Sequence, residues 1–164
     1  MELSTVSGNI STTNDTFADH SLLSATSGDI DSTGDTFSGQ ADITTVSGDV
    51  SMDHDTLNGP AQVNTTSGNI HFNGTLAPST ASSATYQFHT ISGDISIGLP
   101  SSANINVQAL TTSGSIHSDD FPSISVQDTN QGSGSQASGS VGQSPFAFLN
   151  IGTTSGDITI QQNS

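Results

Sequence analysis

The chain has 164 residues, enough for one domain with a core of its own. It contains no lysine and no arginine against 15 acidic residues, so its net charge at pH 7 is −15. This charge excludes nucleic acid and anionic membranes as expected partners, because both would be repelled. Cysteine is absent too, which excludes disulfides and thiolate chemistry. The complete lack of basic side chains indicates either an engineered chain or an unusual selection.

Residues 1–79 contain a repeat with a period of 20 residues, the fourth copy being one residue shorter. A corner motif, SGN or SGD followed by Ile or Val, begins in the four copies at Ser7, Ser27, Ser47 and Ser67. A second motif closes each copy and reads NDTF, GDTF, HDTL and NGTL. Only 30% of the residues are hydrophobic, a composition shared with disordered chains, but apolar residues at fixed positions of a repeat predict an ordered fold.

Apolar and polar residues alternate on both sides of each corner. In the first copy, Leu3, Thr5 and Ser7 lead into the Ser-Gly-Asn corner, and Ile10 follows it. Such short runs separated by turn residues are typical of strands rather than helices. Two short strands and two corners per copy predict an all-β fold, namely a single-domain parallel β-solenoid (β-helix) of about 20 residues per coil, expected to be right-handed. Equivalent side chains should then stack about 4.8 Å apart.

One glycine column is expected to shape the corners, because glycine tolerates positive φ and the close approach of a neighbouring coil. Its members are Gly8, Gly28, Gly48, Gly68, Gly93, Gly114 and Gly156.

The pattern predicts one solenoid domain over residues 1–164. Regular coils should occupy 1–79, and less regular coils 80–126, where YQFHTISGDISI and INVQALTTSGSI restore the pattern. The Gly/Ser-rich stretch 127–144 is expected to be a flexible loop, with a binding loop as the alternative. Residues 145–164, which include TTSGDITI, should form the final coil.

Three features carry a resemblance to a known family: the recurrent T-x-SGD-[IV] corner, Leu99–Pro100 followed by an alternating strand and TTSGSI, and the closing TTSGDITI. Together they resemble a bacterial adhesin domain, a β-strand-repeat family of unknown function found in envelope-associated and secreted proteins. The resemblance covers nearly the whole chain and implies a parallel β-solenoid in an extracellular or cell-envelope setting. It brings no catalytic residues with it. The opening MELSTVSGNI has neither the basic nor the apolar region of a secretory signal.

Three aspartates of the second motif, Asp15, Asp35 and Asp55, share one column, which continues with Gly74. Asp and Asn side chains commonly cap their own turns, and this is the first interpretation of the column. The alternative is a metal site for calcium, because stacked carboxylates supply oxygen ligands and need a counter-charge. Calcium is the one cofactor that the sequence suggests. Repulsion between carboxylates stacked this closely should also raise their pKa values.

Catalytic chemistry is not indicated. The five histidines are scattered without metal-ligating spacing, and the sequence contains no GxSxG elbow, phosphate loop or dinucleotide fingerprint. No catalytic or cofactor-binding residue is therefore predicted, no small-molecule substrate is evident, and the chain is expected not to be an enzyme. A hydrolase acting on polysaccharide, which would need a groove with paired carboxylates, is the least favoured alternative.

The favoured function is structural or adhesive. A solenoid of this composition presents a repetitive acidic and Ser/Thr-rich surface, either to an unidentified surface ligand or to other copies of itself. Besides the calcium-binding alternative, an ice-binding module is considered for the column Thr16, Thr36, Thr56 and Thr75. Threonine is also common in strands because of its high β propensity, which would explain the column without ice binding.

Overall fold

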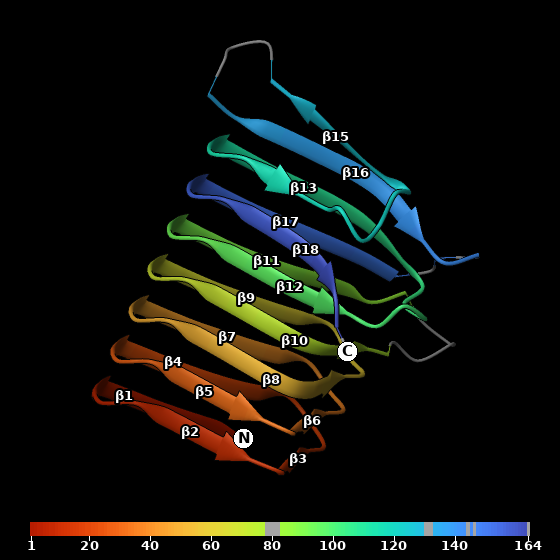
Figure 1. The fold of residues 1–164 in the computed structure, drawn as a ribbon. Coiled ribbons are helices and arrows are strands. Elements are labelled where there is room, and N and C mark those ends of the chain that lie inside the picture. Colours follow the sequence, from red (N-terminus) through yellow and green to blue (C-terminus); the bar gives the residue numbers. More distant parts are fainter. Residues whose placement is uncertain (78–82, 130–132, 144, 146, 164) are drawn as a thin grey trace.

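The computed structural model describes residues 1–77, 83–129, 133–143, 145 and 147–163. These residues contain 18 strands and no helix. Figure 1 shows a stack of flattened coils whose strands form two facing sheets. The all-β parallel solenoid predicted from the repeat is confirmed. None of the described residues belongs to a helix that could cross a membrane.

We call the first sheet of nine strands sheet A. In spatial order it contains β1 (Glu2–Ser7), β4 (Ser21–Ser27), β7 (Ala41–Ser47), β9 (Ala61–Ser67), β11 (Thr85–Ser92), β17 (Ala147–Ser155), β13 (Ile105–Ser113), β16 (Ser135–Val141) and β15 (Ile124–Asp128).

The facing sheet is sheet B, which starts beyond the SGD corner of each coil. It contains β2 (Ile10–Thr13), β5 (Ile30–Thr33), β8 (Val50–Leu57), β10 (Ile70–Leu76), β12 (Ile95–Leu99), β18 (Ile158–Gln162) and β14 (Ile116–His117). Two short strands extend its first coils, β3 (Thr16–Phe17) and β6 (Thr36–Phe37), and β6 also pairs with β8.

The core lies between the two sheets and is built from the apolar columns of the repeat. Leu23 pairs in register with Leu3 on one side and with Ile43 on the other, and Leu23 and Ile43 are fully buried. On the facing sheet, Ile30 is in register with Val50 and is also fully buried. Because strand residues alternate between the two faces of a sheet, every second residue enters this core. The 20-residue period therefore places identical columns on top of one another.

The coil that comes last in sequence is not last in space. β17 lies between β11 and β13, and β18 lies between β12 and β14, as Figure 1 shows by the dark blue ribbons between green and teal ones. The coil predicted over 145–164 is formed by β17 and β18, but it is inserted into the stack instead of ending it. Every coil offers the same edge and the same apolar columns, so a matching strand can pair wherever the stack is open.

The predicted loop over 127–144 is wrong for Ser135–Val141, which form β16. This strand pairs antiparallel with both β13 and β15, and β15 ends sheet A. It is a strand because Ala137 and Val141 alternate with polar residues and are buried against the core. The alternation is difficult to recognise in the sequence, because Gly and Ser surround these two apolar residues. Residues 130–132 and 144 of the stretch, like residues 78–79 of the predicted regular coils, lie outside the described residues.

The fourth coil is shorter by one residue, as the alignment of the motifs predicts. The register between β8 and β10 shifts at Asn73/Gly74, so that Gly74 faces Asp55. The position lost is one that the first three coils hold in a left-handed backbone conformation, at Asn14, Gly34 and His54 with φ of 56°, 69° and 59°. The deletion therefore removes a bulge, and it ends the regular second corner.

Candidate functional site

The SGD corner is held together by one polar side chain in each coil. The Oδ1 atom of this Asp or Asn accepts a hydrogen bond from the backbone N–H of the equivalent residue in the next coil of the stack. The six donor-to-acceptor pairs are Asp29 to Asn9 (3.0 Å), Asp49 to Asp29 (3.0 Å), Asn69 to Asp49 (2.7 Å), Asp94 to Asn69 (2.9 Å), Asp157 to Asp94 (2.8 Å) and Ser115 to Asp157 (2.7 Å). These side chains satisfy the neighbouring coil rather than their own turn. Asn substitutes for Asp because both offer this acceptor.

The threonine of T-x-SG forms a second ladder, which the sequence interpretation missed. Its hydroxyl donates to the corner-glycine carbonyl of the neighbouring coil. The pairs are Thr45 to Gly28 (3.0 Å), Thr65 to Gly48 (3.1 Å), Thr90 to Gly68 (3.0 Å), Thr153 to Gly93 (3.1 Å) and Thr111 to Gly156 (2.8 Å). The signal was the Thr two residues before each Ser-Gly. In the second coil Ala25 stands at this position and cannot donate.

The glycine column is explained by the close approach of the corners of neighbouring coils. A Cβ atom on Gly48 would lie well inside van der Waals distance of the Gly28 carbonyl oxygen, and the same holds at Gly68 against Gly48. At Gly8 a Cβ atom would meet only the Thr5 hydroxyl at 3.6 Å, an ordinary contact, but φ is +137°, a conformation that disfavours side chains. The T-x-SGD-[IV] motif is thus a set of contacts between coils.

The predicted metal column, Asp15, Asp35 and Asp55, lies at the second corner. The Asp35 Oδ1 atom accepts a hydrogen bond from the Asp15 backbone N–H at 2.7 Å, and the Asp55 Oδ1 atom accepts one from the Asp35 N–H, also at 2.7 Å. Asp15 is exposed, whereas Asp35 and Asp55 are 1% and 0% exposed. Among the described residues no three His, Asp or Glu side chains are arranged to hold a metal ion. The calcium role of this column stays a prediction.

Asp55 differs from Asp35 in its second oxygen. The Asp35 Oδ2 atom accepts a hydrogen bond from the Ser32 hydroxyl at 2.8 Å, whereas the Asp55 Oδ2 atom is buried without a hydrogen-bond partner. Burial is the largest effect on the Asp55 carboxyl group and raises its pKa to about 6. The nearby Ser32 hydroxyl and the Asp35 amide lower this pKa by less, and the charges of Asp35 and Asp53 raise it further. The predicted pKa increase is thus found at Asp55, with burial rather than repulsion as its main cause.

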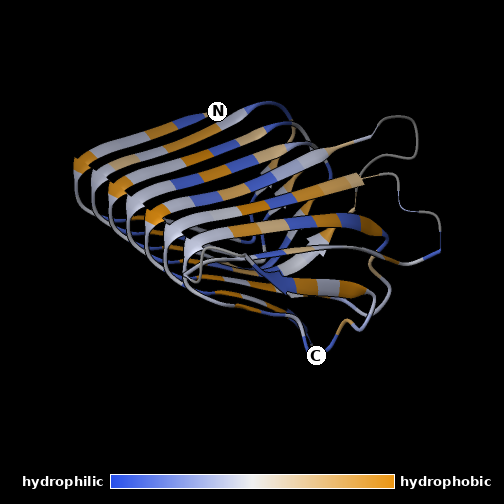
Figure 2. Cartoon of the chain, turned by 90° about the horizontal axis from the view of Figure 1, so that it is seen from above, coloured by the Kyte–Doolittle hydropathy of each residue, from blue (hydrophilic) through white to orange (hydrophobic). Residues whose placement is uncertain are grey.

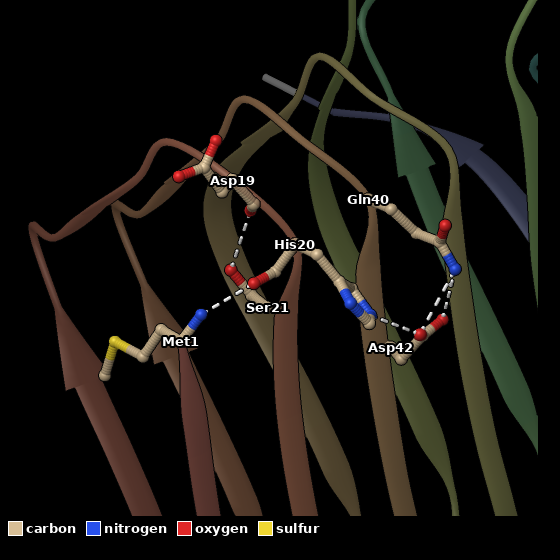
Figure 3. A network of polar contacts seen from close by, with 6 residues as sticks. All are labelled: Met1, Asp19, His20, Ser21, Gln40 and Asp42. Carbon is tan, nitrogen blue, oxygen red and sulfur yellow. Dashed lines mark hydrogen bonds and ion pairs between the residues drawn. The ribbon is translucent and has the colours of Figure 1, made fainter.

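The histidines remain apart from one another. His20 lies 2.6 Å from the Asp42 carboxylate on the next coil, in the network of Figure 3, where the N-terminal amine of Met1 donates to the His20 carbonyl oxygen at 2.6 Å. His54 lies 3.1 Å from Asp53. Both imidazoles are largely exposed, and each is held by a single carboxylate.

An open polar groove of about 560 Å³ lies where the bulge ends. It is lined by His54, Asn73, Gly74, Thr75, Pro100, Gln161, Gln162 and Asn163. Two of its amides are already engaged, because Asn73 donates to Asp53 at 2.9 Å and Asn163 donates to the Gly74 carbonyl oxygen at 3.2 Å. Among the described residues that line the groove, none carries a carboxylate side chain.

The outer face of sheet A carries the most regular exposed feature, which we call the corner ridge. It consists of the residue before each corner serine, in spatial order Val6, Thr26, Val46, Thr66, Ile91, Thr154 and Thr112. All seven are exposed and β-branched; Val6, Val46 and Ile91 are 73%, 46% and 50% exposed. Figure 2 shows orange and pale segments alternating from coil to coil along this edge. The predicted column of Thr16, Thr36, Thr56 and Thr75 is less regular, because Thr36 and Thr56 are half-buried.

Comparison with known proteins agrees with this geometry. The family model described as Toastrack DUF4097 matches residues 1–161, nearly the whole chain. The chain belongs to the Toastrack family. It is a family of unknown function, so the match supports the solenoid of this Toastrack domain and leaves its activity open. No curated protein and no solved structure matches the chain.

Proposed function

We propose that this Toastrack domain is a non-catalytic structural module that adheres to neutral, ordered surfaces through the outer face of sheet A. The corner ridge is the observation that carries the proposal. Three of its members are large apolar side chains exposed to solvent, in a chain with few hydrophobic residues. The contacts of the corner do not require them, since threonine occupies the same column in four other coils.

The physical properties of the ridge suit a flat partner. Its side chains repeat at the coil spacing of about 4.8 Å. They are β-branched and stand on paired strands, so little rotamer freedom is lost when they are covered. The net charge of −15, with no basic side chain to offset it, disfavours anionic partners. We therefore favour an uncharged surface that presents methyl and hydroxyl groups, in an extracellular or cell-envelope setting.

Adsorption to defined monolayers on a quartz crystal microbalance tests this function. The parent domain should adsorb to methyl- and hydroxyl-terminated layers and not to a sulfonate layer. The triple variant Val6→Ser, Val46→Ser and Ile91→Ser should lose about tenfold or more in affinity, because it removes the exposed apolar surface that contact with the layer would bury.

The control variant removes methyl groups from the outer face of sheet B instead. It combines Thr13→Ser, Thr33→Ser and Thr159→Ser, which are exposed or half-buried positions of β2, β5 and β18. Its adsorption should equal that of the parent. Equal adsorption by the ridge variant and the parent would remove the ridge from the proposed function, and strong binding to sulfonate would contradict the neutral partner.

A further inference from the structure

The second corner contains an arrangement that neither the family nor the proposed adhesion explains. In the second coil, Ser32 and Asp35 form a buried hydroxyl–carboxylate pair three residues apart. In the third coil, Met52 is in register with Ser32, and Asp55 follows it three residues later. The third coil has therefore kept the carboxyl group but has no hydroxyl of its own at the Met52 position, and the Ser32 proton is already donated to Asp35.

Asp55 is closed off on every side that the structure describes. Its side chain is 0% exposed, and its Oδ2 atom has no hydrogen-bond partner. Towards β10 the residue in register is Gly74, which has no side chain to donate a hydrogen bond. An ionised carboxylate in such a place is costly, and a neutral carboxyl group costs much less.

The charged groups near Asp55 reinforce this preference. Asp35, in the corner before β6, and Asp53, on β8, both carry the same charge as Asp55 and both raise its pKa. The Nδ1 atom of the neighbouring His54 lies 3.1 Å from the Asp53 carboxylate. The chain contains no lysine or arginine that could neutralise the site.

We propose that Asp55, together with Ser32 and Asp35, forms a buried proton-binding site that makes the second corner of the third coil sensitive to pH. A proton from solvent binds the unpartnered Oδ2 atom of Asp55. The Ser32 hydroxyl, which acts on the Asp55 carboxyl group and donates its own proton to Asp35, has a free lone pair that can accept the new O–H group. The protonated site is satisfied and neutral, whereas the ionised site is strained and opens more readily.

The sign of the pH dependence follows from the raised pKa. Since Asp55 changes from an ordinary 3.8 to about 6 on folding, the folded chain binds the proton more tightly than the unfolded chain. The stabilisation is complete below about pH 4 and is lost as the pH rises towards about 6. Over that interval the melting temperature should fall, in addition to any change caused by the other carboxylates.

The direct test is a carboxyl-carbon NMR titration of Asp55 in the full chain. The expected midpoint is close to 6. Met52→Ser restores the missing hydroxyl donor and should lower that midpoint by about one pH unit or more. The matched control Met52→Ala creates the same loss of volume without a hydroxyl, and it should leave the midpoint at or above its parent value.

Two further variants separate Asp55 from its neighbours. Asp55→Asn should abolish the fall in melting temperature between pH 4 and pH 6, whereas His54→Asn should preserve both that fall and the Asp55 midpoint. A midpoint near 3.8 in the parent would overturn the proposal. Equal midpoints for Met52→Ser and Met52→Ala would overturn it as well, and this comparison holds even if Asp55→Asn fails to fold.

Discussion

The two corners of each coil link neighbouring coils through aspartate side chains that differ in their exposure to solvent. At the SGD corner, six side-chain acceptors and five threonine donors bind the neighbouring coils, and the acceptors lie near the surface. At the second corner, the equivalent aspartates Asp35 and Asp55 are buried, and the column stops at Gly74.

The comparison shows why one corner persists through the stack and the other does not. An exposed acceptor tolerates exchange between Asp and Asn, because water satisfies whatever the neighbouring coil leaves free. A buried carboxylate needs every partner present, and the loss of a single hydroxyl at Met52 leaves Asp55 unsatisfied. The regular corner is therefore the one with contact to solvent.

The largest effect is expected in the core, which both corners share. Ile30→Asp should destabilise the fold by about 4–5 kcal/mol, because a charge without a partner enters a fully buried column. Asp31→Ser, at the exposed neighbouring position, should change the free energy of unfolding by less than about 0.5 kcal/mol. Chemical denaturation of both variants measures the difference. Equal stabilities would mean that the inward column has been misassigned.

The next effect isolates the close approach of coils at the SGD corner. Gly48→Ala should cost about 3 kcal/mol, because its new methyl group meets the Gly28 carbonyl oxygen. Gly8→Ala is the matched control: no coil lies beneath it, so only its positive φ opposes the change, at about 1 kcal/mol. Thermal unfolding should rank the two variants in this order, and the reverse order would contradict the steric explanation.

The same truncation at both corners sharpens the comparison between buried and exposed aspartates. Asp35→Ala should cost about 2–3 kcal/mol, because the Asp15 amide and the Ser32 hydroxyl both lose their acceptor. Asp49→Ala removes one acceptor at an exposed position and should cost about 1 kcal/mol or less. Urea unfolding at pH 7 gives both values. A larger loss at Asp49 would show that the exposed ladder, not the buried pair, stabilises the coils.

The smallest expected effect is a gain in stability. Ala25→Thr should add the hydroxyl that the second coil lacks, directed at the Gly8 carbonyl oxygen, and should stabilise the fold by up to about 1 kcal/mol. Thr65→Val removes the existing bond to the Gly48 carbonyl oxygen and should cost about the same amount. Opposite shifts in melting temperature are the expected result. A loss in both variants would indicate that Ala25 has no room for a larger side chain.

The sequence by itself determined the solenoid, its 20-residue period and its inward columns. These follow from local chemistry: alternation selects strands, Gly and Asp select corners, and an exact repeat length brings Leu3, Leu23 and Ile43 into one column. It also identified the corner glycines and the Asp35–Asp55 column, because each repeats at the same spacing.

Only the tertiary structure decided the order of the coils and the state of each carboxylate. Since all coils present the same edge, the sequence pattern does not specify that β17 pairs between β11 and β13. The pairing of β16 depends on Ala137 and Val141, two modest apolar residues whose burial requires β13 to be in place. Asp15, Asp35 and Asp55 look alike in the repeat, but they range from exposed to fully buried, because burial depends on which coils lie above and below.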